Sequence, residues 1–458
     1  MVCKNCGAEI KQEVKFCPKC GSKIENDMAT ATGRQVNGRW KIITAVVAVF
    51  LVVVGISAIM ASFSGSSQTK HIQYQIIDGN AVVSGYDAGI RKQVIIPSEV
   101  SIGGVTYSVT SIGEYAFEGC SSLESIEIPD SVTSIGVWAF GNCLSLKSIA
   151  ILNSVTSIEW CAFNGCSSLE SVEMPNSVTS IAEAAFAGCS SLKSIEIPDS
   201  VTNIGDSTFA GCSSLESIEI PNSVTSIEMY AFNGCSSLES VEMPNSVTSI
   251  AEAAFAGCSS LKSIEIPNSV TDMEGAFRGC SSLKSIEIPN SVTSIAGAFS
   301  DCSSLNSIEI PDSVTDMRDA FSNCSSLESI EIPDSVMDMG YAFSNCSSLK
   351  SIKIPDSVTD IGGAFSGCSS LKSIKIPDGV TRIESSTFSN CSNLESIEIS
   401  DSVTRIDDYA FRGCSRLESV TLGESTSIGE NAFEGCTALK SLVINGNEVY
   451  FSELLRNP

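Results

Sequence analysis

The sequence predicts a mostly-β solenoid of stacked repeats, preceded by a small metal-binding domain and one membrane-spanning helix. Three observations lead to this fold class. Four cysteines near the N-terminus form two closely spaced pairs, an uncharged apolar segment of twenty residues follows, and a motif of 22 or 23 residues then recurs fifteen times. Repeats of this length cannot bury a hydrophobic face alone, so they stack and share one core.

The first predicted domain, residues 1–24, is a metal site. Cys3 and Cys6 form one C-x2-C pair, and Cys17 and Cys20 form the second. Four thiolates close a tetrahedral site for one structural Zn²⁺ and leave no open catalytic position. So short a segment needs the metal in order to fold. Its CPKCG sequence resembles the second knuckle of the zinc-ribbon family found in many bacterial membrane proteins. The alternatives are four free thiols or a rubredoxin-like iron site.

The apolar segment Ile42–Ala61 follows a polar linker at residues 25–41. Twenty uncharged residues in a helix span the hydrocarbon core of a bilayer. Eight Lys and Arg precede the segment, whereas only Lys70 lies in the fifteen residues after it. The positive-inside rule therefore predicts a single-pass cell-membrane protein with a cytoplasmic N-terminus and extracellular repeats. A cleaved signal peptide and a buried core helix are the alternatives.

A serine-rich spacer at residues 62–70 leads to a predicted β-rich N-terminal cap at 71–110. Strand-like stretches recur in the cap, and Asp78-Gly79-Asn80 is a hairpin turn signal. A solenoid needs a cap to cover the apolar edge of its first repeat. At the other end, residues 445–458 are predicted to form a C-terminal tail.

The repeats occupy residues 111–444, and a phenylalanine marks each of the fifteen copies. A typical unit reads SVTSIGEYAFEGCSSLESIEIPD, and a period of 20–29 with L-x-x-I-x-I is the leucine-rich repeat signature. Over roughly residues 95–444 the pattern resembles the BspA-type leucine-rich repeat proteins. The resemblance implies a surface protein that attaches to host proteins or to other cells.

One repeat shows what each position is expected to do. Leu192, Ile195 and Ile197 point inward from a strand, and Ser194 and Glu196 alternate with them and face solvent. The phenylalanine is expected in a short helical turn. The residue before the following cysteine is Gly, Asn or Asp, which tolerate a tight corner.

The fifteen repeat cysteines form one predicted column of buried, reduced thiols. Equivalent positions of a solenoid stack on one another, and disulfides between neighbouring coils would pull the layers unequally. Buried cysteine behaves as a small hydrophobic residue. Cys161 is additional to this column and is expected at a half-exposed packing position.

The outward strand face carries a column of glutamates over eight consecutive repeats, which we call the glutamate column. Its members are Glu173, Glu196, Glu219, Glu242, Glu265, Glu287, Glu309 and Glu331. Like charges about 5 Å apart repel, so the column destabilises the fold. One interpretation is a binding face for a basic partner or for divalent cations. The other is a solvated surface that keeps sheets from associating, helped by Lys193, Lys262 and Lys284.

The composition excludes several function classes. The net charge of −26 argues against a nucleic-acid partner, because phosphate binding needs excess Lys and Arg. A single histidine, His71, argues against His-based catalysis, and no other catalytic motif is present, so no enzyme is predicted. We expect a membrane-anchored adhesion or recognition protein with a protein ligand on its solenoid. The alternative is a transmembrane sensor or scaffold whose zinc ribbon binds a cytoplasmic partner.

Overall fold

The computed structural model describes residues 71–87, 92–423, 425–444 and 447–450, which belong to one compact unit. The predicted zinc ribbon, linker, apolar segment and spacer lie outside these residues. The described part consists of strands and turns. Within it, no helix of the length and apolarity that a bilayer crossing requires is found.

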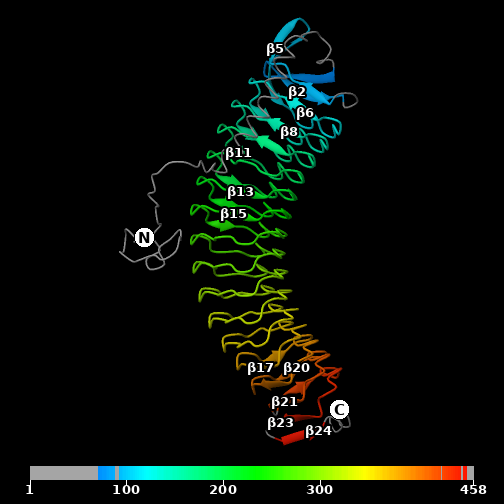
Figure 1. Ribbon diagram of the computed structural model, residues 1–458, viewed down its shortest axis with the longest axis vertical. Helices are drawn as coiled ribbons and strands as arrows, with labels where there is room; N and C mark the ends of the chain where they lie inside the picture. The colour runs from blue at the N-terminus through cyan, green and yellow to red at the C-terminus, as the bar shows by residue number, and fades with distance from the viewer. Residues whose placement is uncertain (1–70, 88–91, 424, 445–446, 451–458) are drawn as a thin grey trace, which may run out of the picture. The chain divides into compact units, whose positions relative to one another are not determined.

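The repeats form consecutive coils that stack along the chain, as Figure 1 shows. The coil around Phe232 is representative. A two-residue strand, β14 (Ser226–Ile227), comes first, a series of turns carries Phe232, and a second strand, β15 (Ser240–Glu242), follows. We call the side of the solenoid that β15 occupies the first strand face, the side of β14 the second strand face, and the side between them the turn face.

Strands of the first strand face pair in parallel with the equivalent strands of neighbouring coils, for example Glu219 with Glu242. These strands are β6 (Ser125–Glu127), β8 (Ser148–Ala150), β10 (Ser171–Glu173), β13 (Ser217–Glu219), β15 (Ser240–Glu242), β17 (Ser373–Ile376), β19 (Ser396–Ile399), β21 (Ser419–Leu422) and β23 (Ser441–Ile444). Those of the second strand face are β7 (Ser134–Ile135), β9 (Ser157–Ile158), β11 (Ser180–Ile181), β12 (Asn203–Ile204), β14 (Ser226–Ile227), β16 (Ser249–Ile250), β18 (Arg382–Ile383), β20 (Arg405–Ile406) and β22 (Ser427–Ile428).

The coils between residues 251 and 372 lack named strands in the described structure, but isolated bridges continue both ladders. Glu287 pairs with Glu309 on the first strand face, and Asp316 pairs with Asp338 on the second. This stretch contains the 22-residue repeats. The strand expected at Leu192–Ile197, in a 23-residue repeat, is likewise absent, so the loss of strands is not confined to the shorter repeats.

The solenoid begins with strands that extend both of its faces. They are β1 (Ile72–Ile77), β2 (Asn80–Tyr86), β3 (Gln93–Ile95), β4 (Glu99–Ile102) and β5 (Val105–Ile112). β3 pairs with β6 on the first strand face, and β5 pairs with β7 on the second. The hairpin predicted at Asp78–Asn80 is present, with positive φ at Asp78 and Gly79. The ring of Tyr86 lies 5.4 Å from that of Phe117 and covers the first coil.

The predicted tail contains a strand that the sequence did not indicate. β24 (Asn447–Tyr450) folds back antiparallel on β23 (Ser441–Ile444). An antiparallel strand is thus the last member of the first strand face within the described residues.

The predicted inward positions are confirmed. Leu192, Ile195 and Ile197 are buried, whereas Ser194 and Glu196 are exposed. The buried residues of all the described coils form one continuous core.

The short helical turn predicted around each phenylalanine is not confirmed: the segment is a chain of tight turns. The Phe232 N–H donates to the carbonyl of Ala254 in the next coil, at 2.7 Å, instead of to a residue four positions earlier. Tyr230 and Gly234, on either side of Phe232, have positive φ of 57° and 73°. A helix needs neither feature and tolerates few residues with positive φ. Bonds between coils therefore alternate with bonds of tight turns within the coil, such as that of the Cys235 N–H to the Phe232 carbonyl at 3.1 Å.

The residue before each cysteine adopts the tight corner that the sequence predicts. Gly257 has a φ of +72°, and Asn323 and Asp301 take the same conformation in other coils. These residue types tolerate positive φ best, which explains why the position varies only among them.

The phenylalanines form one stack along the turn face. Ring centroids of consecutive phenylalanines, from Phe117 to Phe433, lie 5.0–6.0 Å apart, and their planes differ by 3–12°. Such near-parallel rings add attraction beyond their burial.

The repeat cysteines form a buried column beside this stack, as predicted, with Cys436 partly exposed. Each thiol from Cys143 onward also donates a hydrogen bond to the carbonyl of the phenylalanine in the preceding coil. The Sγ of Cys258, for example, lies 3.3 Å from the oxygen of Phe232. Burial raises the pKa of the Cys258 thiol well above its ordinary value, so the thiol stays protonated and unreactive. The repeat thiols therefore donate hydrogen bonds between coils in addition to packing in the apolar core.

We predict that Cys258→Ser destabilises the protein no more than Cys258→Ala does. Alanine loses both the sulfur packing and the donor, at a cost of about 1–3 kcal/mol. Serine keeps a donor beside the Phe232 carbonyl. Denaturant unfolding of the full chain measures both. A serine variant clearly less stable than the alanine variant would show that the column acts only as apolar filling.

Candidate ligand-binding faces

The glutamate column lies on the first strand face, one member in each of eight successive coils. Direct pairing joins Glu219 to Glu242 and Glu287 to Glu309. Glu173 is half-buried and the other seven members are exposed. Each coil contributes one outward glutamate, and equivalent strands pair in parallel register. The glutamate side chains therefore stack at the spacing of neighbouring strands.

A second column of charges runs beside the first, three residues earlier in each repeat, and we call it the paired column. Its lysines bind glutamates of the same column in the preceding coil: Lys193 to Glu170 at 3.9 Å, and Lys262 to Glu239 at 2.8 Å. Lys350 binds Glu328 at 2.6 Å in the same way. Lys193 and Lys262, which were expected to help keep sheets from associating, thus pair within the paired column.

The glutamate column itself makes no ion pair within the described residues. The first cation at its position is Lys353, and the next, Lys375, pairs at 3.2 Å with Glu398 of the following coil. The charge at this column position therefore changes from negative to positive after Glu331. Eight unneutralised carboxylates, each about 5 Å from the next, give this face a strong negative potential.

Two adjoining hollows on the first strand face follow the same column. One, of about 1000 Å³, is lined by residues that include Glu309, Glu331 and Lys353, and the other, of about 830 Å³, includes Glu287 and Glu309. They share Ser307–Ile310. The C-terminal half of the glutamate column is therefore recessed enough to hold an extended segment.

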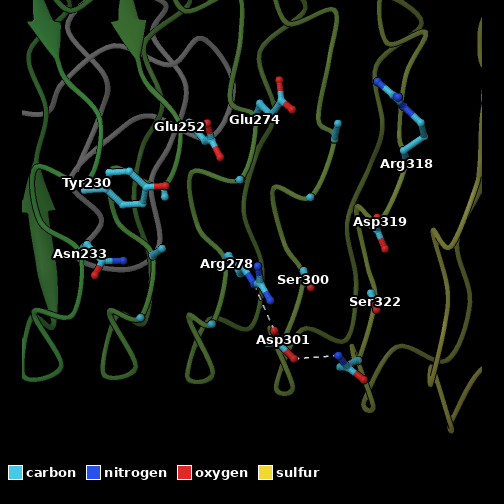
Figure 2. Close-up of a pocket in the computed structure, with 18 residues that line it drawn as sticks. Tyr230, Asn233, Glu252, Glu274, Arg278, Ser300, Asp301, Arg318, Asp319 and Ser322 are labelled. Carbon is cyan, nitrogen blue, oxygen red and sulfur yellow. Dashed lines mark hydrogen bonds and ion pairs between the residues drawn. The ribbon is translucent and has the colours of Figure 1, made fainter. Parts of the chain in front are cut away.

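The turn face carries a groove of about 890 Å³ that the sequence analysis missed. Tyr230 lies at one end, with Arg318 and Asp319 at the other, as Figure 2 shows. Between these ends the equivalent position is filled by Ala253, Gly275 and Gly297. The groove exists because small residues replace a large one in consecutive coils, and an alignment of the repeats carries that signal.

Charges of both signs line this groove. Glu252 and Glu274 follow one edge, while the Nε of Arg278 lies 3.5 Å from an Oδ of Asp301 (Figure 2). Asn323 donates to the other Oδ of Asp301 at 2.8 Å. Because Arg278 is two-thirds exposed, this ion pair is weak and open to competition.

Cys161 is buried instead of half-exposed as expected. Its side chain is 3% exposed, and its φ is +54°. Burial raises the pKa of this thiol, so the structure gives no support to a reactive role. The small cysteine fits under the turn where the sister repeats point a tyrosine to solvent.

The four predicted zinc ligands, Cys3, Cys6, Cys17 and Cys20, lie outside the described residues. Among the residues that are described, no cluster of three or more His, Cys, Asp or Glu side chains could hold a metal ion. The repeat cysteines, spaced along the solenoid axis, are thus not arranged as a second metal site in that part of the chain.

Family models match two parts of the chain. The BspA type leucine-rich repeat region matches residues 100–214, 202–319, 273–363 and 339–454. A zinc-ribbon domain matches residues 2–24. No curated protein matches the sequence.

Solved structures share the solenoid. A leucine-rich repeat protein from Bacteroides ovatus is 32% identical with a TM-score of 0.55, and the match covers 81% of this chain and 93% of that one. A leucine-rich cell surface protein from Faecalibacterium prausnitzii is 31% identical with a TM-score of 0.52, over 82% of this chain and 94% of that one.

Proposed function

Since the chain belongs to the BspA-type leucine-rich repeat family and carries a zinc-ribbon domain, we propose that it is a surface-displayed adhesion or recognition protein. In this proposal the solenoid binds a protein of the host or of a neighbouring cell and performs no catalysis. The similar protein from Faecalibacterium prausnitzii is described as a cell surface protein, which supports the location.

The observation that carries the proposal is the unneutralised glutamate column. A solenoid gains nothing in stability from eight stacked carboxylates, because each neighbouring pair at about 5 Å repels by about 0.8 kcal/mol in water. The paired column shows that the same sheet can place lysine opposite glutamate and avoid this cost. The repulsion is retained on the glutamate column, which makes no ion pair within the described residues.

A basic protein segment is the partner that this face fits. An extended chain laid across the coils can place cationic side chains against carboxylates at strand spacing, and the hollows around Glu309 and Glu331 leave room for it. Binding would relieve the repulsion among the glutamates, so the unbound state is the strained one.

We predict that the triple variant Glu287→Gln, Glu309→Gln, Glu331→Gln, whose glutamates line the two hollows, stabilises the protein and weakens binding. Loss of like-charge neighbours should raise the unfolding free energy by about 1–3 kcal/mol at low salt. Three lost ion pairs with a basic partner should weaken binding about tenfold. Surface-immobilised matrix proteins and neighbouring bacterial cells serve as binding targets, with denaturant unfolding alongside.

The matched control changes the paired column by the same charge. Glu170→Gln, Glu239→Gln and Glu328→Gln each remove the partner of a lysine. This variant should bind within about twofold of the native protein, because the glutamate column remains intact. Equal binding by both triple variants would mean that the glutamate column is only a solvated surface.

The membrane arrangement belongs to the same proposal. Ile42–Ala61 would anchor the chain with residues 1–41 in the cytoplasm, as the eight-to-one bias in Lys and Arg predicts. We expect protease added to intact cells to degrade the repeats and to spare an N-terminal tag. Cleavage of that tag with survival of a C-terminal one would reverse the orientation.

We also propose that Cys3, Cys6, Cys17 and Cys20 bind one structural Zn²⁺. Support comes from the zinc-ribbon match, whose residues 2–24 include all four thiols. Four thiolates suit zinc, which then holds the short segment folded.

Replacing one ligand tests this site in the full chain. Cys17→Ser should lower the zinc content measured by mass spectrometry from about one ion per chain to near zero, because serine offers no thiolate. Cys258→Ser is the control, since Cys258 is buried in the solenoid, and it should keep the metal. Unchanged zinc in the Cys17→Ser protein would rule out the assignment.

A further inference from the structure

The first three coils carry an exposed aromatic cluster that the scaffold does not need. Tyr115 is 50% exposed and Trp160 is 43% exposed, with Trp138 half-buried between them. We call these three side chains the N-terminal aromatic surface. Ala184 and Ala253 occupy the coil position of Trp138 with the same positive φ, 54° and 56° against 53°. Since alanine satisfies the turn, the scaffold does not require the indole of Trp138, and Val137 stands at the coil position of Trp160.

The two tryptophans come from adjacent coils and touch. Their ring centroids lie 6.3 Å apart, and their planes are perpendicular, at 86°. A side chain at Gly141 would collide with the indole of Trp138, so that ring lies against the backbone and is held in place. Perpendicular rings cannot both stack on one flat sugar ring, but they can flank a compact group such as a cation.

The charges around this surface are all negative. Glu114, Glu118 and Glu183 are exposed on the turn face of the first four coils. From residue 93 to residue 192 the only cationic side chain is Lys147, which belongs to the paired column and lies 4.0 Å from Glu124. The aromatic rings therefore lie in a negative electrostatic potential that no Lys or Arg on the turn face of the same coils neutralises.

The C-terminal coils contain a related arrangement that includes its own cation. Tyr409 occupies the same coil position as Tyr115 and Trp138, and the guanidinium of Arg412 lies 5.5 Å from the centre of its ring. The Nε of Arg412 also lies 3.6 Å from an Oε of Glu434 in the next coil. The residue three positions after Trp138, where Arg412 stands relative to Tyr409, is Gly141.

We propose that the N-terminal aromatic surface docks a basic segment of a partner protein, with an Arg or Lys side chain over the indoles of Trp138 and Trp160. Glu183 occupies in the fourth coil the position that Trp160 holds in the third, and the Cys161 N–H donates to its carbonyl at 3.0 Å. Its exposed carboxylate is the acidic group assigned to the docked cation, from a different coil position than Glu434, whose place in the coil after Trp138 is held by Asn164. Indole is the strongest aromatic partner for a cation, and Trp is enriched in binding hot spots.

This inference goes beyond the proposed function, because it concerns the turn face and not the glutamate column. The two faces are tested by different variants, so either can fail without the other. The triple Glu→Gln variant of the glutamate column leaves every residue of the N-terminal aromatic surface unchanged.

The test uses the full chain with Trp40→Phe, which leaves Trp138 and Trp160 as the only tryptophans. The probe is the peptide acetyl-Gly-Gly-Arg-Gly-Gly-amide, and its control is the same peptide with neutral citrulline in place of arginine. Physiological salt screens the long-range attraction of the acidic chain. We expect a saturable change in tryptophan fluorescence with the arginine peptide and at least fivefold weaker binding of the citrulline peptide.

Variants locate the site. Trp160→Ala and Glu183→Gln should each weaken binding of the arginine peptide about fivefold or more. Sister repeats hold Val137 or Glu252 at the coil position of Trp160, so the alanine variant should fold, which thermal unfolding by circular dichroism checks. Tyr341→Ala, at an equally exposed position farther along the same column, should leave binding unchanged.

Three results would overturn the proposal. The first is equal binding of the arginine and citrulline peptides, and the second is unchanged binding by both Trp160→Ala and Glu183→Gln. The third is absence of a saturable change up to about 10 mM peptide, an affinity weaker than about 3 kcal/mol. Saturable binding of a neutral oligosaccharide, such as maltohexaose, in place of the arginine peptide would identify a glycan platform instead.

Discussion

Stacking of near-identical coils at strand spacing is the interaction on which the rest of this structure depends. Each buried residue meets its own counterpart above and below, so every core position must pack well against itself. A phenylalanine ring does so by lying nearly parallel to the next, 5.0–6.0 Å away. A thiol does so by donating to the preceding coil, as Cys258 does to Phe232. A side chain that packs poorly against its own counterpart, or a buried polar group without a partner, would recur in all fifteen repeats. Its unfavourable free energy would then be incurred fifteen times.

The same stacking determines the backbone of the turn face. The N–H groups that a helix would bond internally reach the next coil instead, as Phe232 does to Ala254. The chain must then turn twice through positive φ. One of these corners, before the cysteine, could be predicted because only Gly, Asn and Asp occur there. The other, at Tyr230 and its equivalents, could not be predicted, because Tyr, Trp, Cys, Ala and Ser occur there as well as Gly and Asp, and the bonds between coils impose the conformation.

Periodicity therefore predicted the fold, the inward residues and the glutamate column, since each follows from counting positions along one repeat. It could not predict features that arise between repeats. The groove of Figure 2 was missed because its signal, the succession of small residues Ala253, Gly275 and Gly297, appears only when the repeats are aligned with one another. The burial of Cys161 and the pairing of Lys193 with Glu170 depend on which coil lies beside which. The strand Asn447–Tyr450 was missed because it follows no repeat pattern.

Because the buried positions of this solenoid must repeat, variation among the coils is concentrated at surface positions. The surface charges show which of these positions vary. Lysines of the paired column neutralise glutamates of the preceding coil, as Lys262 does Glu239. Arg412 neutralises Glu434 of the following coil. The glutamate column and the N-terminal aromatic surface lack such cations, although the same fold supplies them elsewhere. Unneutralised carboxylates raise the energy of the unbound protein, and exposed indoles leave apolar area in water. A basic partner removes both penalties at once, so the two surfaces favour the same class of ligand by independent physical routes.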